Sequence, residues 1–404
     1  MREVVITGIG LRTPMGHTLE AVKAVFGSGR PVVRLVPGPG GRQRAFAKME
    51  DDWSTRFSRF DQLLLDPVAQ LAQLASEDAL ADSGLMLEYA DRDRIGVYLG
   101  TGQGSSMTAY ENFTQLATQD TIKSFSVLRA LSNGAASQIA IRHGLRGACE
   151  NVMLACSSSN SAIGNAMRAI RHGYLDAALA GGAEATFNEG AIRSWEALRV
   201  MATVDPAHPE ASCRPFAKDR SGMVLGDGAV LYLLEAAEHA HARGARIYAR
   251  LAGYGASADA VHLAQPDAEG QALALRACLR DAGLATGDIG YINAHGTATP
   301  SADPVEVQAL KAVFGAQADQ IPISSTKSLH GHLLGAAGAI ELLAAIVALT
   351  DGLIAPTANL EQPDPDCDLD FVPLHARKDV DVSAALSSSF AMGGSNTCLA
   401  VTRA

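Results

Sequence analysis

The sequence lacks paired cysteines of the kind that bind metal ions or cycle between thiols and a disulfide. Its six cysteines are scattered over 404 residues, and no two of them form a CxxC pair. A zinc knuckle or a redox dithiol is therefore not indicated. The glycine-containing stretch GTGQGS is too weak a motif to indicate a nucleotide-binding loop. We expect neither a metal nor a cofactor.

Positive charge is also scarce. Lysine and arginine number 33 against 43 aspartates and glutamates, which gives a formal net charge of −10. This balance argues against a nucleic acid partner. An acidic protein partner would need a local patch of basic residues.

Long uninterrupted apolar runs are absent as well. The apolar stretches are broken well short of the length that crosses a membrane. The start, MREVVITGIGLRTP, lacks the apolar block of a secretory signal. We therefore expect a cytoplasmic chain that does not contact a membrane.

What the sequence does contain indicates a duplicated α/β chain. Ala79–Gly102 and Cys278–Thr299 share a helix end at Asp-x-Gly-Leu, a polar loop, an apolar strand and a Gly/Thr turn. Short apolar runs ending in Gly or Ser alternate with helical stretches such as Pro67–Asp82 and Gly270–Asp281. This alternation predicts largely parallel sheets covered by helices. We expect the first half to span residues 1–245 and the second half to span residues 246–404. No Pro- or Ser-rich linker separates them, so we expect the two halves to be rigidly joined.

One cysteine occupies a position suited to chemistry. In MLACSSSNSAIGNAMRAIRHG, Cys156 follows an apolar lead-in and precedes a helical pattern that ends at Gly173. Free N–H groups and the dipole at a helix start stabilise a thiolate, so Cys156 is a candidate nucleophile. A cysteine that only packs in a capping region remains the alternative at this point.

Two histidines stand at similar turns. NAHGTATPSADPVE places His295 at the end of an apolar strand, and SSTKSLHGHLLGAAGAIE places Lys327 and His332 at a strand-to-helix turn. A single histidine more often has a structural role or lies at the surface. Two histidines and a cysteine at corresponding turns of repeated halves favour one shared site.

The motifs together resemble an elongating β-ketoacyl-acyl-carrier-protein synthase of the thiolase superfamily. The resemblance covers the whole chain and rests on ACSSS, GGAEA, SCRPFAKDRSGMVLGDGA, NAHGTATP, STKS with GHLLGAAGAIE, and GGSN. It implies a thiolase-like duplicated fold with two mixed sheets in a layered α-β-α-β-α arrangement. The first half would carry the nucleophilic cysteine, and the second half the two catalytic histidines.

The resemblance also implies the reaction. An acyl group would pass from a carrier-protein thioester to Cys156. Malonyl carrier protein would then lose carbon dioxide, and its enolate would attack the acyl-cysteine in a decarboxylative Claisen condensation. His295 and His332 resemble the pair that stabilises the enolate, best as neutral imidazoles. Lys327 resembles the lysine that orders this site, with Glu341 as its charge partner, because an unpaired buried lysine is costly.

Other residues receive roles by the same resemblance. Met392 falls at the gate residue, usually Phe, and precedes Gly393 and Gly394. Its backbone N–H and that of Cys156 would form the second oxyanion hole. Asp303 and Glu306 match acidic positions of the first histidine motif, and we interpret them as residues that cap a loop. Gln103 is placed on the wall of the acyl pocket. Basic carrier-binding positions are matched by Arg59 and Arg199, with Lys123 and Arg129 as further candidates nearby.

Three other functions compete with a general fatty acid synthase. A degradative thiolase would use a second cysteine near the C-terminus, but Cys398 lies within the apolar strand pattern NTCLAV. A catalytically silent chain-length partner would lack the nucleophile, which is present here. A ketosynthase subunit of a specialised type II polyketide or aryl polyene pathway fits the departures from the family pattern, among them Ala391-Met392 for Gly-Phe, Gln103, and Met223 where Phe is common.

The resemblance finally implies partners. These are an acyl carrier protein loaded with acyl or malonyl groups, and either a second copy of the chain or a silent chain-length-factor-like homologue. The segment Ser132–Gly147, which precedes the nucleophile, is the candidate pairing region.

Overall fold

The computed structural model describes residues 1–38 and 41–404. Its strands are β1 Val4–Arg12, β2 Arg34–Pro37, β3 Gln43–Phe46, β4 Ile95–Gly100, β5 Cys149–Val152, β6 Ala177–Glu184, β7 Gly228–Ala236, β8 Ala249–Ala258, β9 Tyr291–Asn293, β10 Ile323–Ser324, β11 Ala384–Ala391 and β12 Ser395–Thr402. Its α-helices are α1 Leu19–Ser28, α2 Arg59–Leu64, α3 Pro67–Ser83, α4 Ser106–Gln119, α5 Ser126–Arg129, α6 Gly134–His143, α7 Ser158–Arg171, α8 Glu189–Ala197, α9 Ala237–Ala242, α10 Ala268–Ala282, α11 Ala302–Phe314, α12 Lys327–His330 and α13 Ala337–Asp351.

The same five-strand sheet is present twice. The first half has the order β1-β7-β6-β4-β5 and the second half the order β8-β12-β11-β9-β10. In each half the first three strands pair antiparallel and the last three pair parallel. The halves are therefore mixed sheets, as the family resemblance implies, and not the largely parallel sheets that the alternation of elements alone predicts.

The two sheets are continuous with each other. Strands β1 and β8 pair antiparallel through Val5 with Arg250 and Ile6 with Ala249, so the ten strands form one hydrogen-bonded sheet. The pairing of β1 with β8 thus joins the two halves directly through backbone hydrogen bonds, in agreement with the absence of a Pro- or Ser-rich linker between them.

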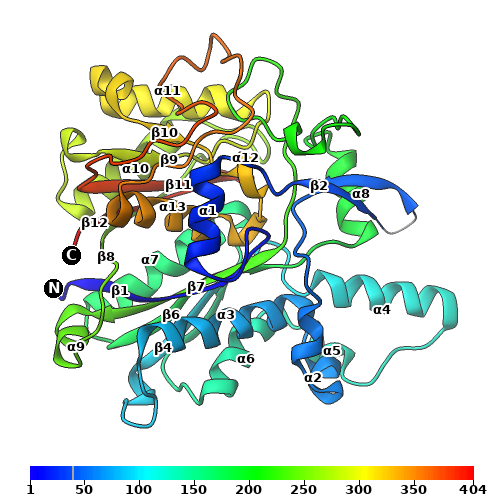
Figure 1. The fold of residues 1–404 in the computed structure, drawn as a ribbon. Helices are drawn as coiled ribbons and strands as arrows, with labels where there is room; N and C mark the ends of the chain where they lie inside the picture. The colour runs from blue at the N-terminus through cyan, green and yellow to red at the C-terminus, as the bar shows by residue number, and fades with distance from the viewer. Residues whose placement is uncertain (39–40) are drawn as a thin grey trace.

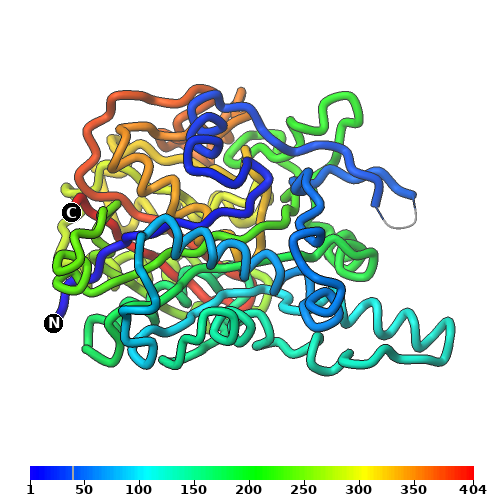
Figure 2. The backbone as a smooth tube through the Cα atoms, turned by 60° about the horizontal axis from the view of Figure 1, so that its bottom comes forward, coloured from blue at the N-terminus to red at the C-terminus, as the bar shows by residue number. Residues whose placement is uncertain are grey.

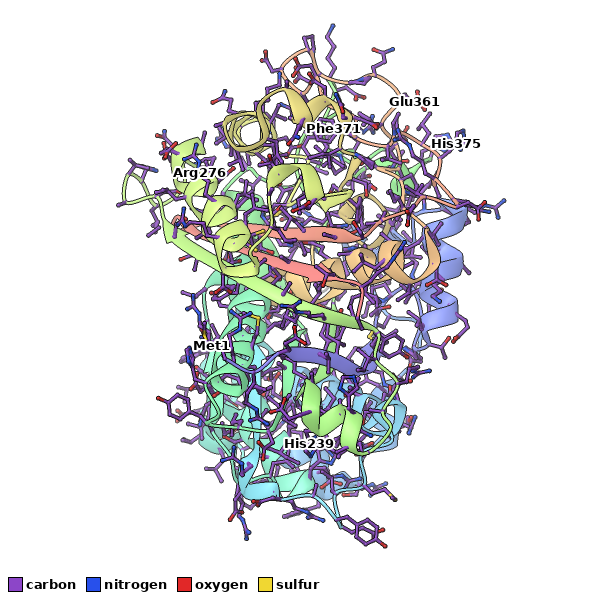
Figure 3. All side chains as sticks on the ribbon, turned by 90° about the vertical axis from the view of Figure 1, so that its left-hand side faces the viewer. Met1, His239, Arg276, Glu361, Phe371 and His375 are labelled. Carbon is purple, nitrogen blue, oxygen red and sulfur yellow. The ribbon has the colours of Figure 1, made fainter. Side chains whose placement is uncertain are left out.

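Helices form three layers around the two halves. Helices α7 and α13 pack against each other and against the inner faces of the two sheets, with α3 and α6 outside the first half and α10 and α11 outside the second (Figure 1). One apolar cluster fills the middle of the molecule, and two others lie under the outer helices. Figure 3 shows the stack from the side, with Arg276 and Phe371 in one half and His239 in the other.

The repeated helix ends confirm the sequence echo. Helix α3 ends at Gly84 with φ 65°, and α10 ends at Gly283 with φ 68°. In this left-handed conformation a glycine avoids the cost that a Cβ would bring. Each end leads through a loop into the fourth strand of its half, β4 or β9.

One helical segment is long and apolar enough to cross a membrane. It runs from Leu334 to Asp351 with a mean hydropathy of 1.7, and 89% of it is buried inside the protein. The segment contains α13, whose side chains pack into the central cluster. It is therefore the core helix of this fold.

Helices α4 and α5 depart from the compact body. Both the ribbon and the backbone trace show α4 projecting to one side (Figure 1, Figure 2). This arm carries exposed apolar side chains, namely Phe113, Leu116, Ile122, Phe125, Val127, Leu128 and Leu131.

Candidate active site

Cys156 lies at a sharp turn between β5 and α7. It is the middle residue of the 3-10 turn Ala155–Ser157, directly before the helix. Ala155 has φ 46°, a left-handed conformation that residues with side chains adopt only where contacts hold them. One such contact is the hydrogen bond of 2.7 Å from the Ser157 hydroxyl to the carbonyl of Ser395. The turn thereby fixes the thiol at the bottom of a cavity.

The second half repeats this turn without a nucleophile. The 3-10 turn Leu334–Ala336 precedes α13, and Leu334 has φ 45°. The residue that corresponds to Cys156 is Gly335. A Cβ at this position would lie 2.0 Å from the backbone nitrogen of Gly102, so no side chain fits there. The corresponding turn of the second half therefore carries no nucleophile.

His332 contacts the thiol directly. Its Nε2 lies 3.0 Å from Sγ of Cys156, and its Nδ1 accepts a hydrogen bond of 3.1 Å from the backbone N–H of Leu334. Because Nδ1 is the acceptor, the proton of the neutral ring is on Nε2. His332 thus points an N–H toward the sulfur.

His295 has the same tautomer for a different reason. Its Nδ1 lies 3.3 Å from Nζ of Lys327, which donates to it and also to the His295 carbonyl. The Nε2 proton again faces the cavity. The two imidazole rings are 5.5 Å apart in an edge-to-face arrangement, and the three reactive atoms of Cys156, His295 and His332 lie within 4.8 Å of one another.

Burial and charge keep both rings neutral. Burial, followed by the positive charge of Lys327, lowers the pKa of His295 and the pKa of His332 well below the usual histidine value. Thiol and imidazole are also frequent metal ligands. Here, however, each Nε2 carries the ring proton, which suits an oxyanion better than a cation.

Lys327 is paired with Glu341, as we expected. Both side chains are completely buried and form a hydrogen-bonded ion pair between α12 and α13. Burial raises the pKa of Glu341 to about 7, while Lys327 opposes this rise. The pair places a positive charge beside the histidines at a point that water does not reach.

Asp303 and Glu306 hold the His295 turn from below. Glu306 accepts the backbone N–H groups of His295 and Gly296, both at 2.7 Å, and Asp303 accepts that of Thr297 at 3.1 Å. Neither carboxyl group lines the cavity. They fix the backbone of the turn and leave the ring free to face the cavity.

The thiol itself is less acidic than its helix-start position predicts. Burial raises the pKa of Cys156 to about 12, although Lys327 and the backbone N–H of Met392 both lower it. Loss of hydration therefore outweighs the stabilisation of the thiolate that the helix start favours. Negative charge on this sulfur has to form during the reaction.

Met392, Gly393 and Gly394 form the turn between β11 and β12. Gly393 has φ 90° and Gly394 has φ 73°. The Gly393 N–H donates to the carbonyl of Leu263 at 2.7 Å, and Asp259 N–H donates to the carbonyl of Gly394 at 2.9 Å. The turn is therefore coupled to the loop after β8, and both segments line the cavity above Cys156.

The cavity has a volume of about 90 Å³ and is mainly apolar. Its lining residues are Cys156, Trp195, Val200, Met223, Asp259, Leu263, Ala264, Gln265, Pro266, Gln271, His295, Thr297, Thr299, Ser301, Ala302, His332, Phe390, Ala391, Met392, Gly394 and Asn396. Gln103 is not among them. Its backbone N–H donates to Glu184 at 3.2 Å, and its place on the wall of the acyl pocket stays a prediction.

Sequence reasoning gave no role to Glu184, although it quoted the GGAEA motif. Both carboxylate oxygens of this buried residue accept backbone N–H groups, from Gly102, Gln103 and Gly335. These contacts tie the loop after β4 to the turn before α13. The available signal was a glutamate among small residues in a buried strand, because a buried carboxylate must find donors.

The candidate carrier-binding residues separate into two places. Arg59, Lys123 and Arg129 line one cavity of about 490 Å³ between α2, α4 and α5. Arg129 also pairs with Glu111 at 2.9 Å. Arg199 lies elsewhere, exposed after α8 and next to Val200 of the Cys156 cavity.

Cys398 is placed away from the reactive groups. It lies in β12, is completely buried and does not line the cavity. The second cysteine that a degradative thiolase would need is not supplied by this residue.

Comparisons with known proteins agree on one family. Residues 1–240 match the model of the beta-ketoacyl synthase N-terminal domain, and residues 248–361 match that of the C-terminal domain. Nodulation protein E of Rhizobium sp. (strain N33) is 42% identical over 99% of this chain and 98% of its own length. The 3-oxoacyl-[acyl-carrier-protein] synthase 2 of Coxiella burnetii is 38% identical over 100% of this chain and 99% of its own.

Two of the solved structures that match over the full chain are ketosynthases of type II systems or of a ketosynthase/chain length factor pair. A type II PKS ketosynthase, in complex with its acyl-carrier protein and bound to the hexaketide, has a TM-score of 0.92 at 31% identity and is covered to 99%. The ishigamide ketosynthase/chain length factor has a TM-score of 0.93 at 30% identity and is also covered to 99%.

Proposed function

The chain belongs to the β-ketoacyl synthase family, and we propose that its reaction, the condensation of an acyl group with a malonyl unit on carrier proteins, takes place at Cys156, His295 and His332. The observation that carries this assignment is the buried cluster of Cys156, His295 and His332, whose reactive atoms lie within 4.8 Å of one another. The enzyme is an acyltransferase of the 3-oxoacyl-[acyl-carrier-protein] synthase type.

In the first step the sulfur of Cys156 attacks the thioester carbonyl of an acyl carrier protein. The Cys156 proton leaves with the pantetheine sulfur. The products are therefore a thioester on Cys156 and a free thiol on the carrier protein. The Nε2–H of His332 and the backbone N–H of Met392 stabilise the charge that develops on the sulfur. The buried positive charge of Lys327 acts in the same direction.

In the second step a malonyl thioester occupies the cavity. The Nε2–H groups of His295 and His332 donate to its thioester oxygen, which makes loss of carbon dioxide to the enolate favourable. The enolate carbon attacks the acyl carbonyl on Cys156, the new carbon–carbon bond forms and the carbon–sulfur bond to Cys156 breaks. The departing thiolate takes one proton from water, which is the proton that the overall condensation consumes. The backbone N–H groups of Cys156 and Met392 hold the oxygen of that acyl carbonyl during attack.

An acyl carrier protein delivers both groups. Carrier proteins of this kind are acidic, so a chain with net charge −10 needs a local basic surface. The cavity that contains Arg59, Lys123 and Arg129 offers one, and Arg199 lies beside the Cys156 cavity. Because Arg129 is already paired with Glu111, Arg59 and Lys123 contribute most of the attraction.

The chain pairs with a second, similar chain. Strand β5 is the last strand of the sheet, and Cys149 and Glu150 in it are exposed. The segments that precede β5 in the chain also expose apolar side chains. They are the arm formed by α4 and α5, and Ile141 of the predicted pairing segment Ser132–Gly147. We favour a homodimer. A partner of the chain-length-factor type is the second candidate, since a structural relative is such a pair.

A specialised pathway fits the gate better than general fatty acid synthesis. Met392 replaces the usual Phe and is narrower and more flexible, so acyl groups that are short, polar or conjugated are the favoured substrates. The higher identity to a nodulation protein than to a synthase 2 agrees with this choice. A type II polyketide or an aryl polyene pathway is the alternative to fatty acid synthesis. We place the enzyme in the cytoplasm and propose no contact with a membrane.

The test follows the acyl group by mass spectrometry. Wild-type protein mixed with an acyl carrier thioester should gain the acyl mass on Cys156, and malonyl carrier protein should then release a product two carbons longer. Cys156→Ala should gain no mass, whereas His295→Ala and His332→Ala should be acylated but should not condense. An adduct that persists in Cys156→Ala would overturn the nucleophile assignment, and near wild-type elongation by either histidine variant would overturn its role.

A further inference from the structure

A second cavity lies beside the one that contains Cys156. Its volume is about 150 Å³, and it is enclosed by strand β3, helix α8 and the segments around residues 201–204 and 223–225. Its lining residues are Gln43, Arg44, Ala45, Phe46, Ile192, Glu196, Met201, Ala202, Val204, Met223, Val224 and Leu225.

Among the residues that the structure describes, Met223 is the one that lines both cavities. Its side chain is 3% exposed and belongs to an apolar cluster with Phe46, Ile192 and Leu225, against which Trp195 packs. Trp195 and Val200 stand on the Cys156 side, and Ile192 and Met201 on the other. Met223 therefore forms part of the partition between the two spaces.

The partition can open at low cost. Methionine is unbranched and has three rotatable side-chain bonds, so it changes shape more readily than an aromatic or β-branched residue.

The lining of the second cavity selects an apolar occupant. Most of its side chains are hydrocarbon or thioether groups. Its charged members, Arg44 and Glu196, are hydrogen-bonded to each other at 2.9 Å, and Arg44 also pairs with Glu189. The positive charge of Arg44 is thus paired with two carboxylates, which disfavours an anionic ligand in this cavity.

We infer that Met223 determines the acyl-chain range of the enzyme, and that its rotation lets the distal hydrocarbon of a Cys156-bound acyl group enter the second cavity. This inference rests on the proposed function, since it requires the acyl group on Cys156. It names a specificity residue and a subsite on the α8 side of the molecule, away from the position of Gln103.

The experiment compares acyl carrier thioesters of short and long chain with four proteins. Met223→Phe should close the passage, and Ile192→Phe should fill the second cavity from a position that does not line the first. Both should lower the ratio of long-chain to short-chain turnover by about tenfold or more, which corresponds to ~1.4 kcal/mol of transition-state binding. Arg193→Phe adds the same ring on the exposed face of α8 and should leave the ratio as in wild type.

Two readouts separate the possible failures. Acylation of Cys156 by a short chain, measured by mass spectrometry, tests the proposed function and does not depend on the second cavity. If that acylation occurs and Ile192→Phe keeps the wild-type chain-length ratio, the inference is overturned. Should Ile192→Phe fail to fold, Ala202→Leu fills the same cavity with a smaller group, and an unchanged ratio in that variant contradicts the inference equally.

Discussion

The ammonium group of Lys327 lies 3.3 Å from Nδ1 of His295 and forms a completely buried ion pair with Glu341. One residue thus sets the tautomer of a histidine, supplies a positive charge near Cys156 and neutralises a buried carboxylate. Mutation can separate these three effects, because neutralising Glu341 affects only the stability of the fold, whereas the tautomer of His295 and the charge near Cys156 affect the reaction.

Lys327→Met should lower both stability and condensation. It leaves Glu341 buried without a partner, a change that costs about 3–5 kcal/mol in comparable buried pairs. Lys327→Met combined with Glu341→Gln removes both charges and should recover much of the thermal stability. The double variant should still fail to condense, because Nδ1 of His295 has lost its donor.

The measurements are thermal unfolding and malonyl-dependent condensation on both variants. Recovery of condensation together with stability would contradict a positioning role for Lys327 and leave it a purely structural residue. His295→Ala in the same assays provides the reference for complete loss of that ring.

The reactivity of Cys156 toward iodoacetamide should rise steadily with pH. Its pKa is about 12, so at pH 6 to 9 the thiolate is the minor form and its fraction increases tenfold for each pH unit. The neighbouring histidines have pKa values well below the usual value and add no step in this range. Alkylation rates of Cys156, followed by peptide mass spectrometry with Cys156→Ala as the blank, test this. A plateau near neutral pH would mean that the resting group is already a thiolate.

Reversal of charge in the basic cavity should weaken carrier recognition without slowing chemistry. Arg59→Glu and Lys123→Glu together should raise the KM for carrier-bound substrate several-fold and leave kcat nearly unchanged, since neither residue lines the Cys156 cavity. Arg199→Glu tests the second location separately. The wild-type KM should increase with salt, because the attraction is between exposed charges. A KM that is the same at low and high salt, in wild type and variant, would refute electrostatic docking here.

The sequence predicts the fold in most of its detail where local signals suffice. The expected helices at Pro67–Asp82 and Gly270–Asp281 match α3 and α10 within two residues, and the echo between halves locates Gly84 and Gly283. The direction of β7 and β12 is not encoded locally, because a fully buried strand has the same apolar run in either orientation. That part of the fold depends on the family resemblance.

The site shows the same division. Strand-to-helix turns predict where Cys156, His295 and His332 stand along the chain, and the fold brings them together. The pKa of the thiol depends instead on how completely distant segments cover it, which no local pattern reports. Gln103 shows the same limit, since its motif position predicts an acyl pocket wall, while the structure shows only that its backbone N–H donates to Glu184 and that it does not line the Cys156 cavity.

The gate residue provides the last prediction. Met392 stands where the family usually has Phe, and Ala391 before it is a less flexible backbone position than glycine. Motion at the gate is therefore shifted from the main chain to the Met392 side chain, with Gly393 and Gly394 keeping the turn in its left-handed conformation.

We expect wild-type enzyme to elongate short, polar or conjugated acyl groups faster than long saturated ones. Met392→Phe should slow acylation by bulky conjugated groups several-fold while acetyl transfer changes little, and Ala391→Gly combined with Met392→Phe should restore part of the lost rate by returning mobility to the backbone. A panel of saturated and polyunsaturated carrier thioesters, with acylation and elongation measured separately, checks this. Fastest turnover on long saturated chains in the wild type would mean that the methionine gate does not select against them and that the enzyme serves general fatty acid synthesis.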